Sequence, residues 1–172
     1  MSLTKTMEAA LNKQVNAELY SAYLYLSMSA DFEAKNLKGF ANWMFVQAQE
    51  EMTHVMKIYR HILDRGGKVV LDKVAKPKTT WKTPLDAFQD AYKHEKEITA
   101  MINNLVRLAK KQNDHATESM LQWFVDEQVE EEANTDEIVQ KLKMVKNSGE
   151  GILIIDKELS QRVFVDNTKA AQ

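Results

Sequence analysis

The sequence has no cysteine among its 172 residues. That absence excludes disulfides, iron–sulfur clusters, thiolate zinc sites and cysteine nucleophiles together. Proline and glycine are also scarce, with two and five residues respectively. Because few residues would interrupt a helix, and because glutamate, lysine, alanine and leucine are plentiful, the composition predicts a mostly helical protein.

The chain also lacks a strong net charge and a long apolar run. The formal net charge is −2, so nothing global favours nucleic acid or an anionic membrane as a partner. No stretch approaches the ~20 apolar residues that a membrane span needs, and residues 1–5 lack the apolar core of a secretory signal. We expect a cytoplasmic protein whose residues 1–172 form one domain with a substantial core.

Apolar residues spaced by three and four predict four long helices. The expected ranges are 4–34, 37–65, 84–112 and 114–147. The short link at 35–36 makes the first two helices antiparallel neighbours. The segment 68–84 holds both prolines and is long enough to cross the length of a bundle, so the second and third helices are expected to run parallel.

Helix ends carry their own signals. Thr83 before Pro84 is typical of an N-cap followed by proline at the first helical position, and Asp114 is expected to cap the fourth helix. Residues 148–151 read as a turn, after which a short fifth helix is expected at 152–163. A polar tail follows at 166–172.

Each of the four apolar stripes carries an acid near its middle. Residues three and four apart share one helix face, so these side chains are expected to meet inside the bundle. An unpaired buried charge costs several kcal/mol even after relaxation. Four acids at one level therefore predict that cations lie between them. The polar residues on the stripes are Glu18, Glu51, His54, Glu95, Gln128 and Glu131.

The spacing of Glu51 and His54 is a weak signal alone, because a solvated polar pair is the commoner explanation; their place on the stripe favours ligation. Four carboxylates would balance two divalent cations, with Glu51 bridging, Glu18 and His54 on one ion, and Glu95 and Glu131 on the other. Oxygen-rich ligation with one imidazole and no sulfur suits iron or manganese. Zinc would bind without redox chemistry. We expect raised carboxylate pKa values in the metal-free protein.

Two residues beside this site have alternative interpretations. Tyr25, two turns beyond Glu18, is either an ordinary buried tyrosine with a satisfied hydroxyl or a redox-active or hydrogen-bonding neighbour of the metals. Gln128 either hydrogen-bonds a ligand or bound oxygen, or fills a polar gap.

A run of acids at 127–132 is usually a solvated helix face. Here Glu127 and Glu130 share a face beside that of Glu131, and Glu50 could join them from the second helix. The alternative is a third, more exposed metal site made by these four residues.

Five segments together resemble the non-haem ferritins of bacteria and archaea over nearly the full length. They are NAELYSAYLY, QAQEEMTH, YKHEKEI, LQWFVDEQVEEEA and GEGILIIDKEL. The resemblance implies an all-α, ferritin-like four-helix bundle with one long crossover between the second and third helices and a short fifth helix.

The resemblance also implies a site. Glu18, Glu51 and His54 match the first iron site of the family, and Glu51, Glu95 and Glu131 match the second. Tyr25 and Gln128 match residues beside that centre. A third iron site would use further glutamates, namely Glu50, Glu127 and Glu130 together with Glu131.

The implied function is oxidation of iron(II) by oxygen or peroxide and storage as a ferric mineral in a hollow shell of twenty-four subunits. An apolar surface nearly all round residues 19–26 also predicts a covering subunit. Bacterioferritins repeat Glu-x-x-His on the fourth helix, whereas this chain has Gln128 and Glu131. Met52 stands where they place a haem-ligating methionine; we interpret it as packing and expect no haem.

Two other functions remain open. One is a di-iron oxidase or peroxidase that acts without storage, and the other is a structural bundle without metal. A miniature DNA-protecting ferritin is disfavoured, because those proteins place ligands between subunits and generally lack a fifth helix.

Overall fold

The computed structural model describes residues 2–146 and 148–169. Within these residues the chain forms α-helices, one short 3₁₀ helix and no strand. The elements are α1 (Lys5–Ala34), α2 (Lys38–Asp64), α3 (Pro84–Gln112), α4 (His115–Val145), α5 (Gly149–Leu159) and η1 (Asn167–Lys169).

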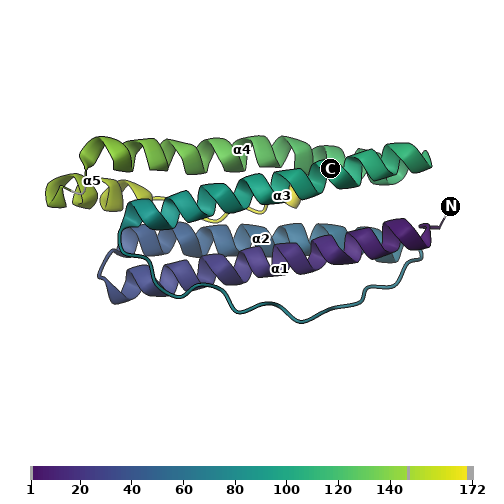
Figure 1. Cartoon of the computed structure of the whole chain (residues 1–172), viewed down its shortest axis with the longest axis horizontal. Helices are drawn as coiled ribbons and strands as arrows, with labels where there is room; N and C mark the ends of the chain where they lie inside the picture. Colours follow the sequence, from purple (N-terminus) through teal and green to yellow (C-terminus); the bar gives the residue numbers. More distant parts are fainter. Residues whose placement is uncertain (1, 147, 170–172) are drawn as a thin grey trace.

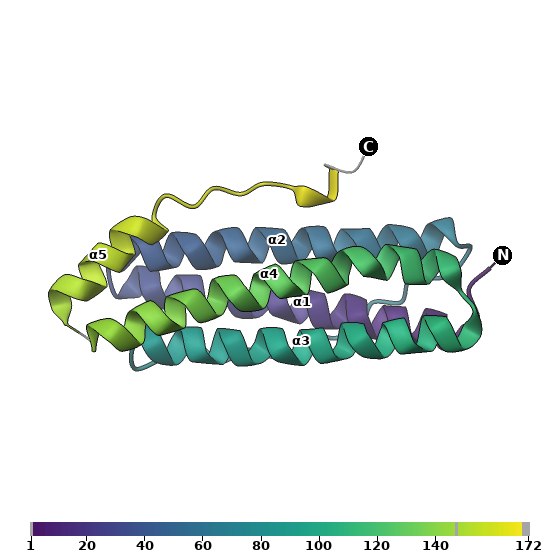
Figure 2. The ribbon, with the colours of Figure 1, turned by 90° about the horizontal axis from the view of Figure 1, so that it is seen from above.

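The four long helices form two antiparallel pairs (Figure 1). α1 packs against α2, α3 packs against α4, and α1 also contacts α3. α2 and α3 run in the same direction, and α5 packs across one end of the bundle against α2 and α4 (Figure 2). The expected all-α four-helix bundle with one long crossover and a short fifth helix is confirmed.

The crossover between α2 and α3 follows the outer side of α1 (Figure 1). Polar side chains of α1 hold its backbone in place. Asn12 Nδ2 donates to the Lys68 carbonyl at 2.9 Å and Asn12 Oδ1 accepts from the Val70 amide at 2.7 Å. Ser27 Oγ donates to the Lys78 carbonyl at 2.7 Å. The segment is therefore ordered by the helix surface, since side chains satisfy backbone groups that no strand or helix satisfies.

The expected caps of α3 and α4 are confirmed. The Thr83 hydroxyl oxygen accepts from the Asp86 amide, and the Asp86 carboxylate accepts from the Thr83 amide, which completes a capping box. Asp114 caps α4 by accepting from the Thr117 amide at 3.2 Å. α4 is described to Val145, so the expected end at Asn147 lies outside the described residues.

The start and end of the fifth helix differ from the expected 152–163. α5 begins at Gly149, because the Ser148 side chain caps it by accepting from the Gly151 amide at 3.2 Å. It ends at Leu159. Beyond it, Asn42 Nδ2 of α2 donates to the Arg162 carbonyl at 2.9 Å. The chain then runs beside α2 to η1 (Figure 2). Residues 170–172 of the expected tail lie outside the described part.

α2 receives its N-terminal cap from α5. Its own N-cap residue, Leu37, has no side chain that could accept a hydrogen bond from the first turn. Instead Asp156 Oδ1 of α5 accepts from the amides of Gly39 at 2.8 Å and Phe40 at 3.0 Å. A carboxylate is favourable there, because it satisfies two unpaired N–H groups and faces the positive end of the helix dipole.

Apolar side chains fill the bundle in two clusters. One contains Phe32, Phe40 and Phe88 and lies near α5. The other contains Leu11 and Ile102 and lies toward the opposite end. Between them is a belt of buried polar side chains contributed by all four long helices, at most 3% exposed: Glu18, Glu51, His54, Glu95, Gln128 and Glu131.

A glycine-to-alanine pair tests the contact between α5 and α2. A Cβ on Gly39 would lie 1.6 Å from the Asp156 carbonyl oxygen, whereas one on Gly149 would meet nothing within 4 Å. We expect Gly39→Ala to lower the free energy of unfolding by about 1–3 kcal/mol or more, because backbone must move. Gly149→Ala, the matched control, should be neutral or slightly stabilising. Equal urea midpoints for the two variants would contradict the close approach.

Candidate metal centre

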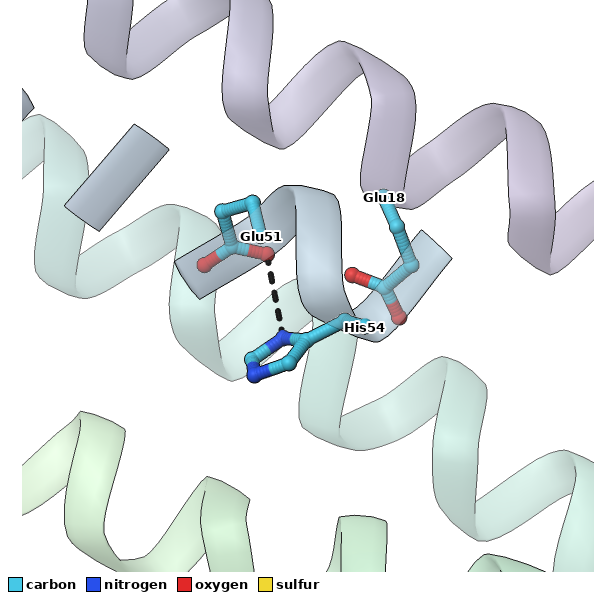
Figure 3. A group of neighbouring side chains, drawn as sticks. All are labelled: Glu18, Glu51 and His54. Atoms are coloured by element: carbon cyan, nitrogen blue, oxygen red, sulfur yellow. Dashed lines mark ion pairs between the residues drawn. The ribbon is translucent and has the colours of Figure 1, made fainter. Parts of the chain in front are cut away.

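The first group of candidate ligands combines α1 and α2. Glu18 extends from α1 toward Glu51 and His54 on α2 (Figure 3). One ligand atom from each residue lies within 4.8 Å of the other two. His54 Nδ1 faces Glu51 Oε2 at 3.3 Å. The spacing of Glu51 and His54 therefore brings both side chains to one buried point, rather than to the solvated face that was the alternative.

Glu18 carries an orphaned oxygen. Its Oε1 accepts from Gln14 Nε2 at 2.7 Å. Its Oε2 is buried and has no hydrogen-bond partner, and no other buried side-chain oxygen or nitrogen of the described residues is in this state. Leaving such an atom unpaired costs about 1–3 kcal/mol. A free carboxylate oxygen beside an imidazole and a second carboxylate fits a hard or borderline cation that takes oxygen and nitrogen ligands.

A second group reaches across to α4. It consists of His54, Glu127 and Glu131, again with ligand atoms within 4.8 Å of one another. His54 Nε2 lies 3.9 Å from Glu127 Oε1. The imidazole thus faces a carboxylate through each of its nitrogens, Glu51 on one side and Glu127 on the other.

Glu95 of α3 is held by the two residues expected beside the site. The Tyr25 hydroxyl donates to Glu95 Oε1. Gln128 Nε2 donates to Glu95 Oε2 at 3.2 Å. Tyr25 and Gln128 are therefore both hydrogen-bond donors to a candidate ligand. Among the residues described, Glu95 joins neither of the two groups above.

Sequence reasoning missed two glutamines. Gln47 Nε2 donates to Glu51 Oε1 at 3.1 Å and to Glu131 Oε2 at 2.7 Å, and Gln14 donates to Glu18 as described above. Each lies four residues before a candidate ligand on the same helix, the spacing at which side chains of a helix meet. That spacing is the signal that could have found them.

The residues expected in a third site are only partly assembled. Glu127 belongs to the second group, whereas Glu130 is exposed. Glu50 accepts a hydrogen bond from the Arg162 guanidinium. In the described part of the chain neither Glu50 nor Glu130 falls within a three-residue ligand group. Burial raises the pKa of Glu50 to about 7, although Arg162 opposes the shift.

Burial dominates the titration of the centre. It raises the pKa of Glu18 and of Glu95 to about 8 in each case, reinforced by the charge of Glu51. It also raises the pKa of Glu131 well above its ordinary value, with Glu95 adding to the effect. The expected rise is thus confirmed for these three carboxyls. Without a cation, protons must neutralise them.

Glu51 departs from that expectation. Burial pushes its pKa up, but the charge and hydrogen bond of His54 outweigh burial, so the Glu51 pKa lies below its ordinary value. Burial likewise favours neutral His54, yet Glu51 and its neighbours raise the His54 pKa to about 10. The pair is therefore an ion pair in the metal-free protein, and His54 must lose a proton before it can ligate.

A bundle whose helices bring glutamates and a histidine together at mid-height defines the ferritin-like class of metal-binding helical proteins. A family model described as "Ferritin-like domain" matches residues 8–145. The chain belongs to the ferritin family.

Curated relatives and solved structures agree with this assignment. The bacterial non-heme ferritin of Bacteroides fragilis is 41% identical over 160 residues, covering 93% of this chain and 99% of the relative. That of Staphylococcus epidermidis is 38% identical over 162 residues, covering 94% and 98%. The crystal structure of an open pore ferritin from the archaeon Archaeoglobus fulgidus superimposes with a TM-score of 0.93 at 49% identity, covering 94% of this chain and all of that one.

Membership of this family establishes iron storage with ferroxidase activity, and the buried carboxylate–histidine cluster is consistent with a di-iron site. Across the described residues, no helix has both the length and the apolar character needed to cross a membrane.

Metal-free stability should fall as the pH rises. The pKa values of Glu18 and Glu95 are higher in the folded state, about 8, than the value of 4.5 expected when unfolded. The stability that these two groups contribute is therefore complete below pH 4.5 and is lost as the pH rises through about 8. His54, raised to about 10, shifts stability in the same direction above its unfolded value near 6.5. The melting temperature in chelator should therefore be lower near pH 8 than near ~pH 5.5.

Zinc ions should reduce this difference, because the metal replaces the protons. The rise in melting temperature on adding zinc should be larger near pH 8 than near ~pH 5.5. A Glu18→Gln variant should show a shallower slope in chelator, since one titrating group is gone. If the melting temperature of the protein in chelator increased with pH, the buried carboxyls would not be protonated in the metal-free protein.

Proposed function

We propose that this chain oxidises iron(II) at a bridged di-iron centre and stores the product as a ferric mineral inside a cytoplasmic shell of twenty-four subunits. The orphaned Oε2 of Glu18 carries the proposal most directly, because it is a buried carboxylate oxygen with no protein partner beside His54 and Glu51. Iron(II) is here the substrate and the cargo.

The proposed ligands combine the group of Glu18, Glu51 and His54 with Glu131 of the second group and with Glu95, whose charge raises the Glu131 pKa. Glu18 and His54 hold one iron, Glu95 and Glu131 hold the other, and Glu51 bridges them. Glu51 suits the bridging role because it faces His54 on one side and shares the Gln47 amide with Glu131 on the other. Tyr25 and Gln128 orient the second iron's ligand Glu95 through its two oxygens. Hydrogen bonds of this kind fix a ligand's direction.

The reaction takes one electron from each of two iron(II) ions. Two electrons reduce dioxygen to the level of peroxide, or reduce hydrogen peroxide with two protons to two molecules of water. The chain contributes four side-chain carboxylates that balance two divalent ions, and it releases protons from Glu18, Glu95 and His54 as iron enters. Burial keeps bulk water out, which strengthens every charge interaction in the centre.

A third iron site is proposed at the edge of the centre. A carboxylate oxygen of Glu127 lies within 4.8 Å of one of Glu131. The charge of Glu127 contributes to raising the Glu50 pKa, and the charge of Glu130 contributes to raising the Glu127 pKa. Iron would have to displace Arg162 from Glu50 to use all four carboxylates.

Assembly is supported by apolar side chains that the single chain leaves uncovered. Tyr23 and Leu26 of α1 are 50% and 44% exposed. Met52, interpreted from the sequence as packing, is 42% exposed and lines a groove of about 700 Å³ with Leu26 and Phe164. These side chains suit contacts between copies of the chain, which is the usual fate of large apolar patches.

Removing the bridging carboxylate should stop fast oxidation. We expect Glu51→Ala to reduce the initial rate of iron(II) oxidation, measured by absorbance at two iron ions per subunit, by more than about 10-fold, since outer-shell changes alone cost that much. Glu97→Gln is the control, because Glu97 is an exposed residue paired with Lys93. Unchanged initial rates in Glu51→Ala would refute the centre.

Shell assembly can be measured independently of chemistry. Light scattering should give about twenty-four times the subunit mass of 19.8 kDa, and electron microscopy after aerobic iron loading should show a mineral core. A protein of only a few subunits that oxidises iron without forming a core would favour the alternative, a di-iron oxidase or peroxidase without storage.

A further inference from the structure

Arg162 lies beyond α5, three residues after the helix ends, yet its guanidinium reaches the edge of the metal centre. Nη2 donates to Gln47 Oε1 at 2.8 Å and also to Glu50 Oε2. Nη1 donates to the Trp43 carbonyl at 3.3 Å, and the guanidinium carbon lies 4.3 Å from the Trp43 ring centroid. Four contacts to α2 therefore fix the direction of this side chain.

The contact with Gln47 determines which way the amide points. A guanidinium has donors and no acceptor, so the end of the Gln47 amide that faces Arg162 must be its oxygen. The nitrogen then faces inward, where it donates to Glu51 Oε1 at 3.1 Å and Glu131 Oε2 at 2.7 Å. One amide thus spans two carboxylates from α2 and α4.

We propose that Arg162 is a positioning residue of the metal centre, which acts through Gln47 to orient the carboxylates of Glu51 and Glu131. The assignment rests on the proposed function in that these two carboxylates are taken as metal ligands. Arg162 itself touches no metal; its effect is to exclude the amide orientation in which an oxygen would face two acids.

Loss of Arg162 removes this constraint. Gln47 can then rotate and present its oxygen to carboxylates, which is repulsive when they are ionised. The lost donor bonds leave Glu51 and Glu131 free to turn away from a common ion. Removing a partner that orients a ligand typically costs about 10–100-fold in metal affinity or activity.

The test combines Arg162→Ala with Gln47→Leu in a double-mutant cycle. Anaerobic titration with cobalt(II), followed by its visible absorption, reports metal affinity and ligand geometry without any oxidation. Oxidation of two iron(II) ions per subunit gives the rate. We expect each single variant to weaken cobalt binding about 10-fold and alter the spectrum. The double variant should be no weaker than Gln47→Leu alone, because both changes remove one interaction.

Matched controls separate positioning from anchoring of α5. Lys141→Ala removes the ion pair to Glu158, an exposed contact between α4 and α5, and should leave the cobalt spectrum and the rate unchanged. Arg162→Lys keeps a side chain that only donates and should restore part of the affinity. If Arg162→Ala does not assemble, the cycle is run with Arg162→Gln, whose amide can face Gln47 by either end.

Three results would overturn the proposal. Cobalt affinity and spectrum unchanged in Arg162→Ala is the first. The second is multiplicative losses in the double variant, which would mean that Arg162 acts independently of Gln47. The third is a cycle in which Arg162→Ala is additive with Gln47→Leu but non-additive with Glu50→Gln, which would mean that Arg162 acts through Glu50 and not through Gln47. If the wild-type protein shows no fast iron oxidation, the proposed function fails, while the cobalt cycle still reports whether Arg162 orients the site.

Discussion

The cost of burying carboxylates governs this protein. Glu18, Glu51, Glu95 and Glu131 lie on four different helices, between two apolar clusters that exclude water. In that environment the ionised form of each is unfavourable unless a positive charge lies beside it. His54 provides one such charge and stabilises Glu51, and protons neutralise the others in the metal-free chain. Divalent ions can replace these protons, so the same burial that penalises the acids gives the site its affinity for metal.

Much of the fold and the burial of the candidate ligands could be predicted, because both are encoded in local periodicity. Side chains such as Glu18 and Glu95 are recognisable since an acid within an apolar stripe must be buried once the helix packs. Pairwise effects are different. The low pKa of Glu51 depends on how close His54 lies, and the hydrogen bond from Gln128 to Glu95 depends on how α4 is rotated relative to α3. Neither is visible in the spacing along one helix.

The contacts that α5 makes could not be predicted from the sequence for the same reason. The sequence suggested a turn at 148–151, but Ser148 caps a helix that begins at Gly149. Asp156 meets the amide of Gly39, and Arg162 meets Gln47, at sequence separations of 117 and 115 residues. Such contacts leave no periodic pattern, and an aspartate or arginine near the end of a chain is ordinarily a solvated side chain. Only the packing of α5 on α2 gives these residues their roles.

α2 connects the α5 end of the bundle with the candidate metal centre. Its N-terminus is capped by Asp156 of α5, its middle carries Gln47, Glu51 and His54, and Arg162 contacts it between these points. Asp156 of α5 and Arg162 beyond it therefore both contact the helix that carries two of the candidate ligands.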